Sequence, residues 1–193
     1  NLGNGNTADT YVGSSSNQTD SPHSPAGESN SLGNASTNSV TGRNNVTNPP
    51  TAFMSYRGIE NFFGNCWNWV DGVNVNVSGE TADGWHVSNT DTDFADDTAT
   101  NHTRIATAMP GDGYVVDIDD AGAAAGAFIP DDTSGGSSST YITDYFFDDN
   151  NNTNRVALLG GNAFTGAFAG AFCWAVTDSS SSASRSIGAR VCF

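Results

Sequence analysis

The chain has 193 residues, 36% of them hydrophobic and 10% aromatic, which suits one globular domain with a core better than two domains. All its cationic side chains are arginine and its formal net charge is −15 at pH 7, so its surface repels phosphate and argues against a nucleic-acid partner. No apolar run approaches the roughly 18 residues of a membrane helix, so we expect no membrane span.

The N-terminal region, residues 1–52, is rich in Asn, Ser, Thr and Gly and poor in aliphatic residues. Such a composition cannot form a core of its own. Tyr11, Val12 and Leu32 nevertheless offer small apolar anchors. We therefore predict that residues 1–52 form an extended segment packed on a domain that spans residues 53–193.

Aromatic residues become frequent from Phe53 onward. Tyr56, Ile59, Phe62 and Phe63 lie close to helical spacing, which predicts a short amphipathic helix that ends at Gly64. Apolar and polar residues then alternate from Cys66 to Val77, which predicts a strand.

The polar, acidic stretch from Ser78 to Thr103 is interpreted as a loop. Further apolar runs predict strands at 113–116, 141–147, 155–159, 172–176 and 187–193. Residues 160–171 and 177–186 contain almost no large aliphatic residues, so they are expected to be two long loops that face outward. With 22 glycines and frequent turn residues, these elements predict an α+β class that is rich in loops, with short antiparallel strands and one or two short helices.

Residue types that carry catalysis or bind metals show no recognised spacing. His23, His86 and His102 lie in polar segments and are interpreted as solvated loop histidines. Aspartates cluster near residues 91–97, 117–120 and 148–149, which leaves a structural calcium ion as an alternative to a chain without cofactors. The sequence therefore predicts no catalytic residues, no metal ligands and no cofactor.

Several segments of the chain resemble one protein family. MSYRGIENFFGNCWNWVDGV at residues 54–73 resembles the pattern Y-R-G-x-E-N-x-x-G-N-x-W-x-W-x-D-G of C-type lectin folds of the formylglycine-generating-enzyme type. RVALLGGN at 155–162, GAFCW at 170–174 and IGAR at 187–190 resemble the variable proteins of diversity-generating retroelements. The resemblance covers about residues 53–193 and implies a C-type lectin fold with a variable ligand-binding region at about 160–190.

In that family a reverse transcriptase replaces template adenines, which changes asparagine codons such as AAC without creating a stop codon. Cys173 fits the same chemistry, because one adenine change converts a tyrosine codon into a cysteine codon. The resemblance implies that the variable, ligand-binding positions are Ala163, Phe164, Thr165, Phe168, Cys173, Ala175, Thr177, Asp178, Ser182, Ser184 and Ser186.

The family resemblance implies a non-catalytic display protein of a cell or virion surface, whose partners are varied macromolecules on another cell or virus. Phe164 and Phe168 in Gly/Ala-rich loops fit this function as exposed aromatic anchors. Two alternatives remain: an enzyme of the formylglycine-generating type that uses Cys173 and Cys192, and a structural surface protein.

Three structural expectations follow. Trp67, Trp69, Phe172 and Trp174 are expected to be largely buried, because their rings lie on alternating, strand-like segments. Ala175 and Thr177 should share the face opposite Trp174 and Val176. A common exposed face is expected for Phe164, Thr165, Phe168, Ala175, Thr177, Asp178, Ser184 and Ser186.

Overall fold

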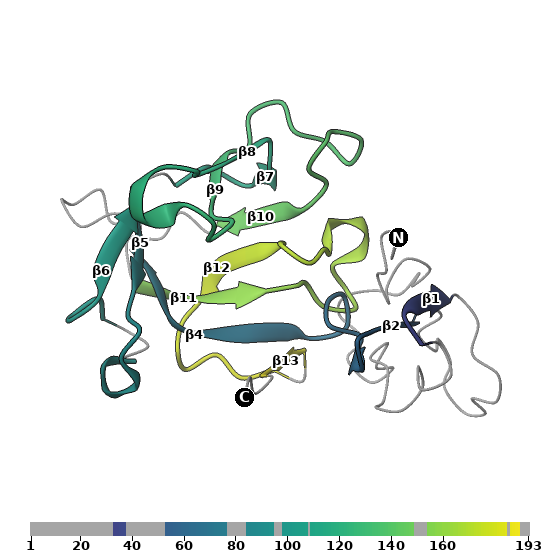
Figure 1. Ribbon diagram of the computed structural model, residues 1–193, viewed down its shortest axis with the longest axis horizontal. Helices are drawn as coiled ribbons and strands as arrows, with labels where there is room; N and C mark the ends of the chain where they lie inside the picture. Colours follow the sequence, from purple (N-terminus) through teal and green to yellow (C-terminus); the bar gives the residue numbers. More distant parts are fainter. Residues whose placement is uncertain are drawn as a thin grey trace.

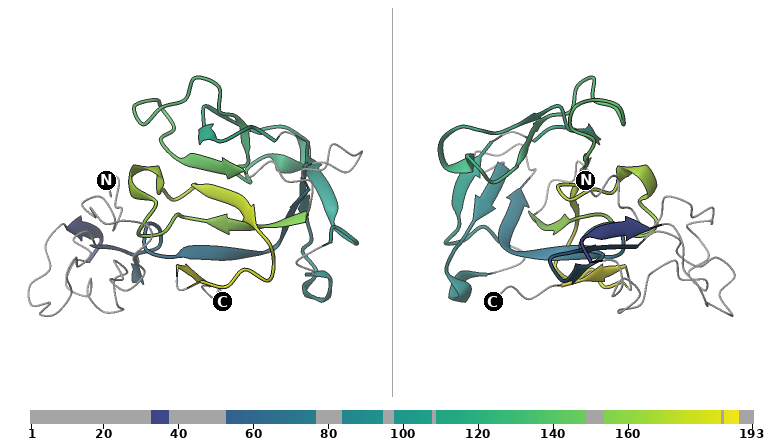
Figure 2. Two further views of the ribbon diagram at one scale, coloured as in Figure 1. Left: turned by 180° about the vertical axis from the view of Figure 1, so that it is seen from behind. Right: turned by 45° about the vertical axis from the view of Figure 1, so that its right-hand side comes forward.

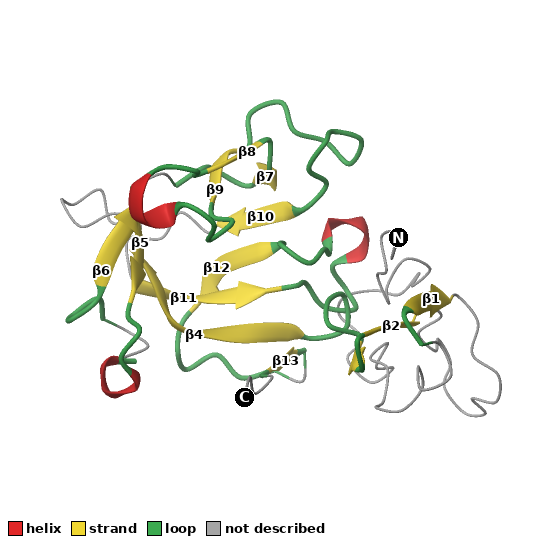
Figure 3. Ribbon diagram, in the orientation of Figure 1, coloured by secondary structure: helices red, strands yellow, loops and turns green. Residues whose placement is uncertain are grey.

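The structure, a computed structural model (Figure 1), describes residues 33–37, 53–76, 84–94, 98–107, 109–148, 154–184 and 186–189. The described chain is mostly strand and loop, and its helices are single 3-10 turns, drawn red in Figure 3. These short helices are η1 (Asp91–Asp93), η2 (Gly122–Ala124) and η3 (Gly166–Phe168). The loop-rich, strand-rich part of the expected α+β class is therefore present, whereas the described residues contain no α-helix.

An 8-stranded sheet forms the body of the molecule, in the order β6-β5-β4-β11-β12-β10-β7, with β13 beside β4. Its pairs are antiparallel except for β10 with β12 and β13 with β4, which are parallel. The strands are β4 (Trp67–Asn76), β5 (Gly84–Val87), β6 (Thr103–Ala106), β7 (Gly113–Tyr114), β10 (Tyr145–Asp148), β11 (Asn154–Leu159), β12 (Trp174–Asp178) and β13 (Ile187–Gly188).

Strand β4 bends in its middle, and this bend curls the sheet. Against β11, Val70 pairs with Ala157 and Asn74 pairs with Val156, so the residues between Val70 and Asn74 bulge out of the ladder. One edge of β4 pairs with β13 before the bulge and with β5 after it. As a result β5 and β6 turn away from the plane of β4, β11 and β12, as the two views of Figure 2 show.

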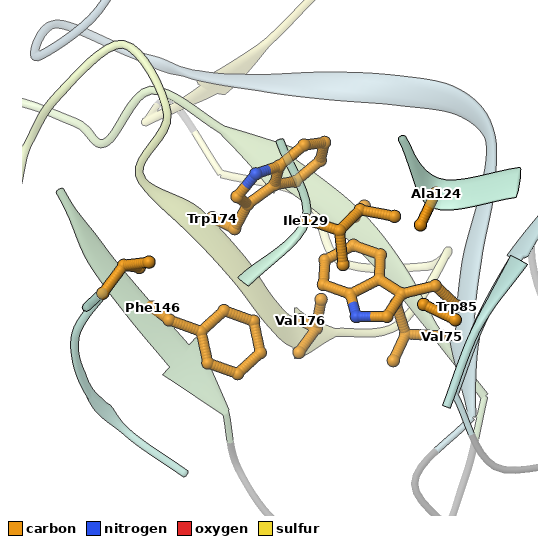
Figure 4. Close-up of a cluster of buried hydrophobic side chains, with 10 residues drawn as sticks. Val75, Trp85, Ala124, Ile129, Phe146, Trp174 and Val176 are labelled. Atoms are coloured by element: carbon orange, nitrogen blue, oxygen red, sulfur yellow. The ribbon is translucent and has the colours of Figure 1, made fainter. Parts of the chain in front are cut away.

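The hydrophobic core fills the inner face of this curled sheet (Figure 4). Trp85 of β5 contacts Trp174 of β12 edge-on, with ring centroids 5.3 Å apart, and lies 6.2 Å from Phe146 of β10. A two-stranded sheet is formed by β8 (Asp117–Ile118) and β9 (Pro130–Asp132). Ile129, which directly precedes β9, and Ala124 of η2 belong to the same core cluster. The core therefore joins elements that lie far apart in the sequence.

The expected helix over residues 56–63 is wrong, because the structure has a β-hairpin there. Strands β2 (Phe53–Tyr56) and β3 (Ile59–Glu60) pair antiparallel, with Tyr56 opposite Ile59. Arg57 and Gly58 form the turn with φ values of 51° and 80°, and positive φ at both central residues is typical of two-residue hairpins. The helix-like spacing of Tyr56 and Ile59 is thus the spacing of cross-strand partners.

The interpretation of residues 78–103 as a loop is also wrong in part. Strand β5 lies within this stretch, and Trp85 is completely buried between the core residues of β4 and β12. His86 is buried rather than solvated, and its Nδ1 lies 3.1 Å from the carbonyl oxygen of Gly84. The sequence did not reveal this short strand, because the polar residues of the loops on either side of it dominate the composition of the stretch.

The N-terminal segment is described only at residues 33–37. There β1 (Ala35–Thr37) pairs antiparallel with β2, and Ala35 lies opposite Ser55. The packing of the rest of residues 1–52 lies outside the described residues and stays a prediction. Within the part of the chain that is described, no helix has the length and apolar character needed to cross a membrane.

Candidate functional site

Alternation along the central strands separates a core face from an outer face. Trp174 and Val176 of β12 belong to the core cluster, so Ala175 and Thr177 lie on the opposite face, as the sequence predicts. Phe146 of β10 is likewise in the core. Its neighbours Tyr145 and Phe147 therefore belong to the outer face.

Strand register aligns the outer-face residues in rows across the sheet. Ala175 lies opposite Leu158 of β11 on one side and Phe147 of β10 on the other. Leu158 in turn lies opposite Trp69 of β4. The small side chain of Ala175 leaves space between the large rings of β4 and β10.

Two aromatic side chains meet across this space. The rings of Trp67 and Phe147 make an edge-to-face contact at 5.9 Å, although β11 and β12 separate their strands. Strands lie about 4.8 Å apart, so only large side chains can span two intervening strands. Ala175 is 3% exposed and forms part of the floor beneath these rings.

The outer face carries an open hollow of about 340 Å³ that we call the aromatic hollow. Its lining contains aromatic, small and hydroxyl or amide side chains but no ionisable group, in a chain whose net charge is −15. The lining residues are Trp67, Phe147, Asn162, Phe164, Thr165, Phe168, Ala175 and Thr177.

Side-chain hydrogen bonds fix the loop that follows β11. The Oδ1 atom of Asn162 accepts hydrogen bonds from the Phe164 amide at 2.8 Å and from the Thr165 hydroxyl at 3.0 Å. The Thr165 Oγ1 atom accepts a third bond from the Asn162 amide at 2.9 Å. This Asx-type turn holds Phe164 and Thr165 at the rim of the aromatic hollow.

The same loop is anchored to the segment before β4. The Gly64 amide donates to Gly160 O at 3.0 Å, and the Ala163 amide donates to Asn65 O at 3.0 Å. Gly161 has a φ of 75°, and a Cβ on it would lie 2.7 Å from the Cβ of Ala169. The two ends of the loop therefore pack so closely that glycine is required at residue 161.

Helix η3 places Phe168 on the aromatic rows of the outer face. The Phe168 ring lies 4.6 Å from Tyr145, 5.6 Å from Tyr114 and 6.1 Å from Phe147. Phe168 is nevertheless among the exposed large hydrophobic residues. It is thus held by neighbouring rings while one side stays open to a ligand.

The expected second loop, residues 177–186, begins within β12, and only Thr177 of this stretch lines the hollow. Thr177 lines it, while Asp178, whose Oδ2 accepts a hydrogen bond from the Thr177 hydroxyl at 3.2 Å, does not. The backbone oxygen of Ser186 accepts a hydrogen bond from the Trp67 amide at 2.8 Å, which ties the loop to β4. Ser182 is half-buried and Ser184 is exposed, both outside the hollow.

The predicted convergence is therefore partial. Five of the predicted positions line the aromatic hollow, namely Phe164, Thr165, Phe168, Ala175 and Thr177. Ala163 and Cys173 have no exposed surface, and Ala175 and Ser186 are buried at 3% and 8% exposure. The expectation that these four side chains are exposed is therefore wrong, although Ala175 forms part of the floor of the hollow. The base of the 160–171 loop is hydrogen-bonded to Asn65 and Cys173, whereas Ser186 lies against β4, where its carbonyl oxygen accepts a hydrogen bond from the Trp67 amide.

The predicted burial of three tryptophans and of Phe172 is confirmed only in part. Trp174 is buried at 7% exposure, as expected, and its Nε1–H donates to Phe128 O at 3.1 Å. Trp67 and Trp69 are only half-buried, on the outer face, so the prediction that they are largely buried is not confirmed. Phe172 is 44% exposed, so its predicted burial is wrong, because it precedes β12 and is outside the alternating ladder.

Cys173 does not have the surroundings of a reactive thiolate. Burial, together with the nearby Asp144 carboxylate, raises the pKa of its thiol far above the usual range. A neutral, buried thiol is a poor nucleophile and a poor metal ligand. Cys192, its proposed partner in catalysis, lies outside the described residues.

The candidate calcium clusters are only partly described. No group of three or more His, Cys, Asp or Glu side chains in the described ranges is arranged to hold a metal ion. Asp96, Asp97 and Asp149 lie outside those ranges. The structural calcium ion therefore stays untested.

Tyr114, Tyr145, Phe147 and Asn162 complete the site, and sequence reasoning did not select them. Burial and the Asp112 carboxylate raise the pKa of Tyr145, so its hydroxyl stays protonated. The signal for the aromatic pair was present in the sequence, since Tyr145 and Phe147 flank a core residue at the spacing of two that defines one face of a strand.

The chain matches no protein-family model, and comparisons with curated proteins and with solved structures give no match either. Functional inference therefore depends on the residues and geometry of the site itself.

Proposed function

We propose that this protein is a non-catalytic ligand-display protein with a C-type lectin fold of the formylglycine-generating-enzyme type, diversified by a retroelement. Its ligand surface would be the aromatic hollow together with the rims formed by residues 160–168 and 177–184. Its partners would be varied macromolecules on another cell or virus, met from a cell or virion surface.

One observation carries the proposal: residues 164, 165, 168, 175 and 177, singled out from the sequence as variable, line a single hollow. They come from one loop, which includes η3, and from strand β12, so their proximity is a product of the tertiary structure. Scattered positions could not supply the roughly 800 Å² per partner of a standard interface.

The chemistry of the hollow fits a protein ligand. Phe164 and Phe168 supply large, rigid apolar contacts at its rim, and such rings often dominate binding energy. Hydrogen-bond donors and acceptors are supplied by the side chains of Thr165, Thr177 and Asn162. Because the lining has no charge, different side chains at the variable positions would change the ligand without leaving an unpaired buried ion.

The enzyme alternative is disfavoured by the burial of Cys173 and the raised pKa of its thiol. The structural-protein alternative differs from our proposal in one measurable respect. A structural surface protein would not concentrate sequence variation at the hollow.

A display experiment tests the binding function. One library would randomise Phe164, Thr165, Phe168 and Thr177. A matched control library would randomise four exposed residues away from the hollow, Thr103, Asp117, Asp131 and Ser138. Both would be sorted for protease-resistant folded members and then selected against an unrelated purified protein such as lysozyme.

We expect specific binders from the first library and none from the second, because only the first changes a preformed hollow. Equal yields from both libraries would contradict the proposal. Sequencing the neighbouring genome gives an independent check on the retroelement. We expect a near-copy of the region that encodes residues 160–190 beside a reverse-transcriptase gene, with sister genomes differing at the lining codons.

A further inference from the structure

A second group of exposed aromatic residues lies outside the aromatic hollow and shares no lining residue with it. Phe128 is 45% exposed, and its ring stacks on Phe172 with centroids 4.5 Å apart and planes 22° apart. Tyr141, which is fully exposed, lines the same concavity of about 330 Å³. We call this concavity the Phe128 hollow.

The backbone holds Phe128 outward at a cost. Phe128 has a φ of 55°, a conformation that side chains with a Cβ rarely adopt. Its carbonyl oxygen accepts the indole hydrogen bond of buried Trp174, and the next residue, Ile129, is fixed in the core. Strain that the core maintains at an exposed aromatic residue is typical of binding sites.

Asp144 is one of the residues that line this hollow, and it also lines an adjoining cavity beside Gly170. Asp144 is half-buried, and its Oδ1 atom accepts a 3.4 Å hydrogen bond from the Phe172 amide. Among the described residues no cationic side chain pairs with it, and it is the only acidic residue that lines the hollow. A half-buried carboxylate without a cationic partner favours a ligand that brings the positive charge.

We propose that the Phe128 hollow is a second binding site and that it takes an arginine side chain of a protein partner. The aliphatic stem would lie against Ile118 and Phe172, and the guanidinium would reach Asp144. Arginine fits better than lysine because its planar, weakly hydrated head stacks on aromatic rings and can bond a carboxylate through two hydrogens. The net charge of −15 would attract a basic partner to this surface.

The test is a titration of the intact protein with N-acetyl-arginine amide, followed by NMR. The indole N–H resonance of Trp174 is the reporter, because that group bonds the Phe128 carbonyl. We expect a saturable shift with a dissociation constant on the order of 1 mM, the usual strength of a ligand of this size. The isosteric but uncharged N-acetyl-citrulline amide should bind at least about tenfold more weakly.

Variants separate the charge from the rings. Asp144→Asn should weaken binding of the arginine probe by about tenfold or more, because a charged hydrogen bond is lost. Tyr141→Ala, at a side chain too exposed to support the fold, should weaken it by a smaller factor. Phe168→Ala removes an exposed ring of the aromatic hollow and should leave the affinity for the arginine probe unchanged. This control separates the Phe128 hollow from the proposed display surface.

The proposal is overturned if the Trp174 resonance shows no saturable shift, or if citrulline binds as tightly as arginine. Equal affinity for N-acetyl-lysine amide would overturn the assignment to arginine. Unchanged affinity in both Asp144→Asn and Tyr141→Ala, with thermal melts like that of the parent, would show that the probe binds elsewhere.

Discussion

At the scale of single residues, positions two apart in the sequence have very different environments. Phe172 and Trp174 both belong to an aromatic segment, yet only Trp174 enters the β12 ladder and the core. Phe172 stays on the surface, where it stacks on Phe128. The difference lies in which side chain the neighbouring strands cover.

Alanine substitution at these two positions should therefore have unequal effects. Trp174→Ala should lower the free energy of unfolding by about 3–5 kcal/mol, because it opens a cavity beside Trp85 and removes the hydrogen bond to Phe128. Phe172→Ala, at a ring that is nearly half exposed, should cost no more than about 1 kcal/mol. Urea unfolding of both variants measures this, and equal losses would show that the two rings are equally buried.

At the scale of elements, glycine geometry decides how the loop after β11 closes. Gly161 and Gly166 both have positive φ, at 75° and 63°. A Cβ at Gly161 would collide with Ala169, whereas a Cβ at Gly166 would meet nothing within 4 Å. The two positions thus share the backbone strain but differ in packing.

Replacing each glycine by alanine separates the energetic cost of the left-handed backbone conformation from the cost of the steric clash. Gly166→Ala should cost about 1–2 kcal/mol for the left-handed conformation alone. Gly161→Ala should cost about 1–3 kcal/mol more, because residues 161 and 169 must also move apart. Thermal or urea unfolding gives the difference, and hydrogen exchange at the Phe164 and Thr165 amides should rise only in Gly161→Ala. Equal stabilities would mean that the loop does not close against Ala169.

At the scale of the whole molecule, the curled sheet buries a histidine of β5, between β4 and β6, in an acidic protein. Burial is the main cause that lowers the pKa of His86, and the Arg104 charge acts in the same direction. Because the folded state binds this proton more weakly than the unfolded chain does, protonation favours unfolding.

His86 should consequently make stability depend on pH. Its contribution is present above about pH 6.5, the ordinary value for histidine, and is lost as the pH falls through the lower pKa of the folded state. The free energy of unfolding should therefore fall as the pH is lowered below about 6.5, and His86→Gln should reduce that slope. Urea unfolding across this range, with an NMR titration of the ring, tests it. A slope unchanged by His86→Gln would place the pH dependence on other groups.

Local sequence patterns predicted several strands of this structure correctly. Alternation in residues 66–77 correctly predicted β4, and the apolar runs around 145, 155 and 174 predicted three further strands of the same sheet. The opposite faces of Ala175 and Trp174 followed from the same period of two. The hairpin at Tyr56 and the strand at Trp85 were not recoverable in this way, because a two-residue turn can imitate helical spacing and a short strand has too few residues to show a period.

The sequence by itself determined the strands of the outer face, the glycine- and alanine-rich loops beside them, the acidic surface and the identity of five residues that line the aromatic hollow. Only the tertiary structure decided that Trp67 and Phe147 meet above Ala175, that Ala163 and Cys173 are covered, and that Phe128 and Phe172 form a second exposed surface. The physical reason is that a strand's period fixes which side chains share a face, whereas exposure depends on which distant segment covers that face.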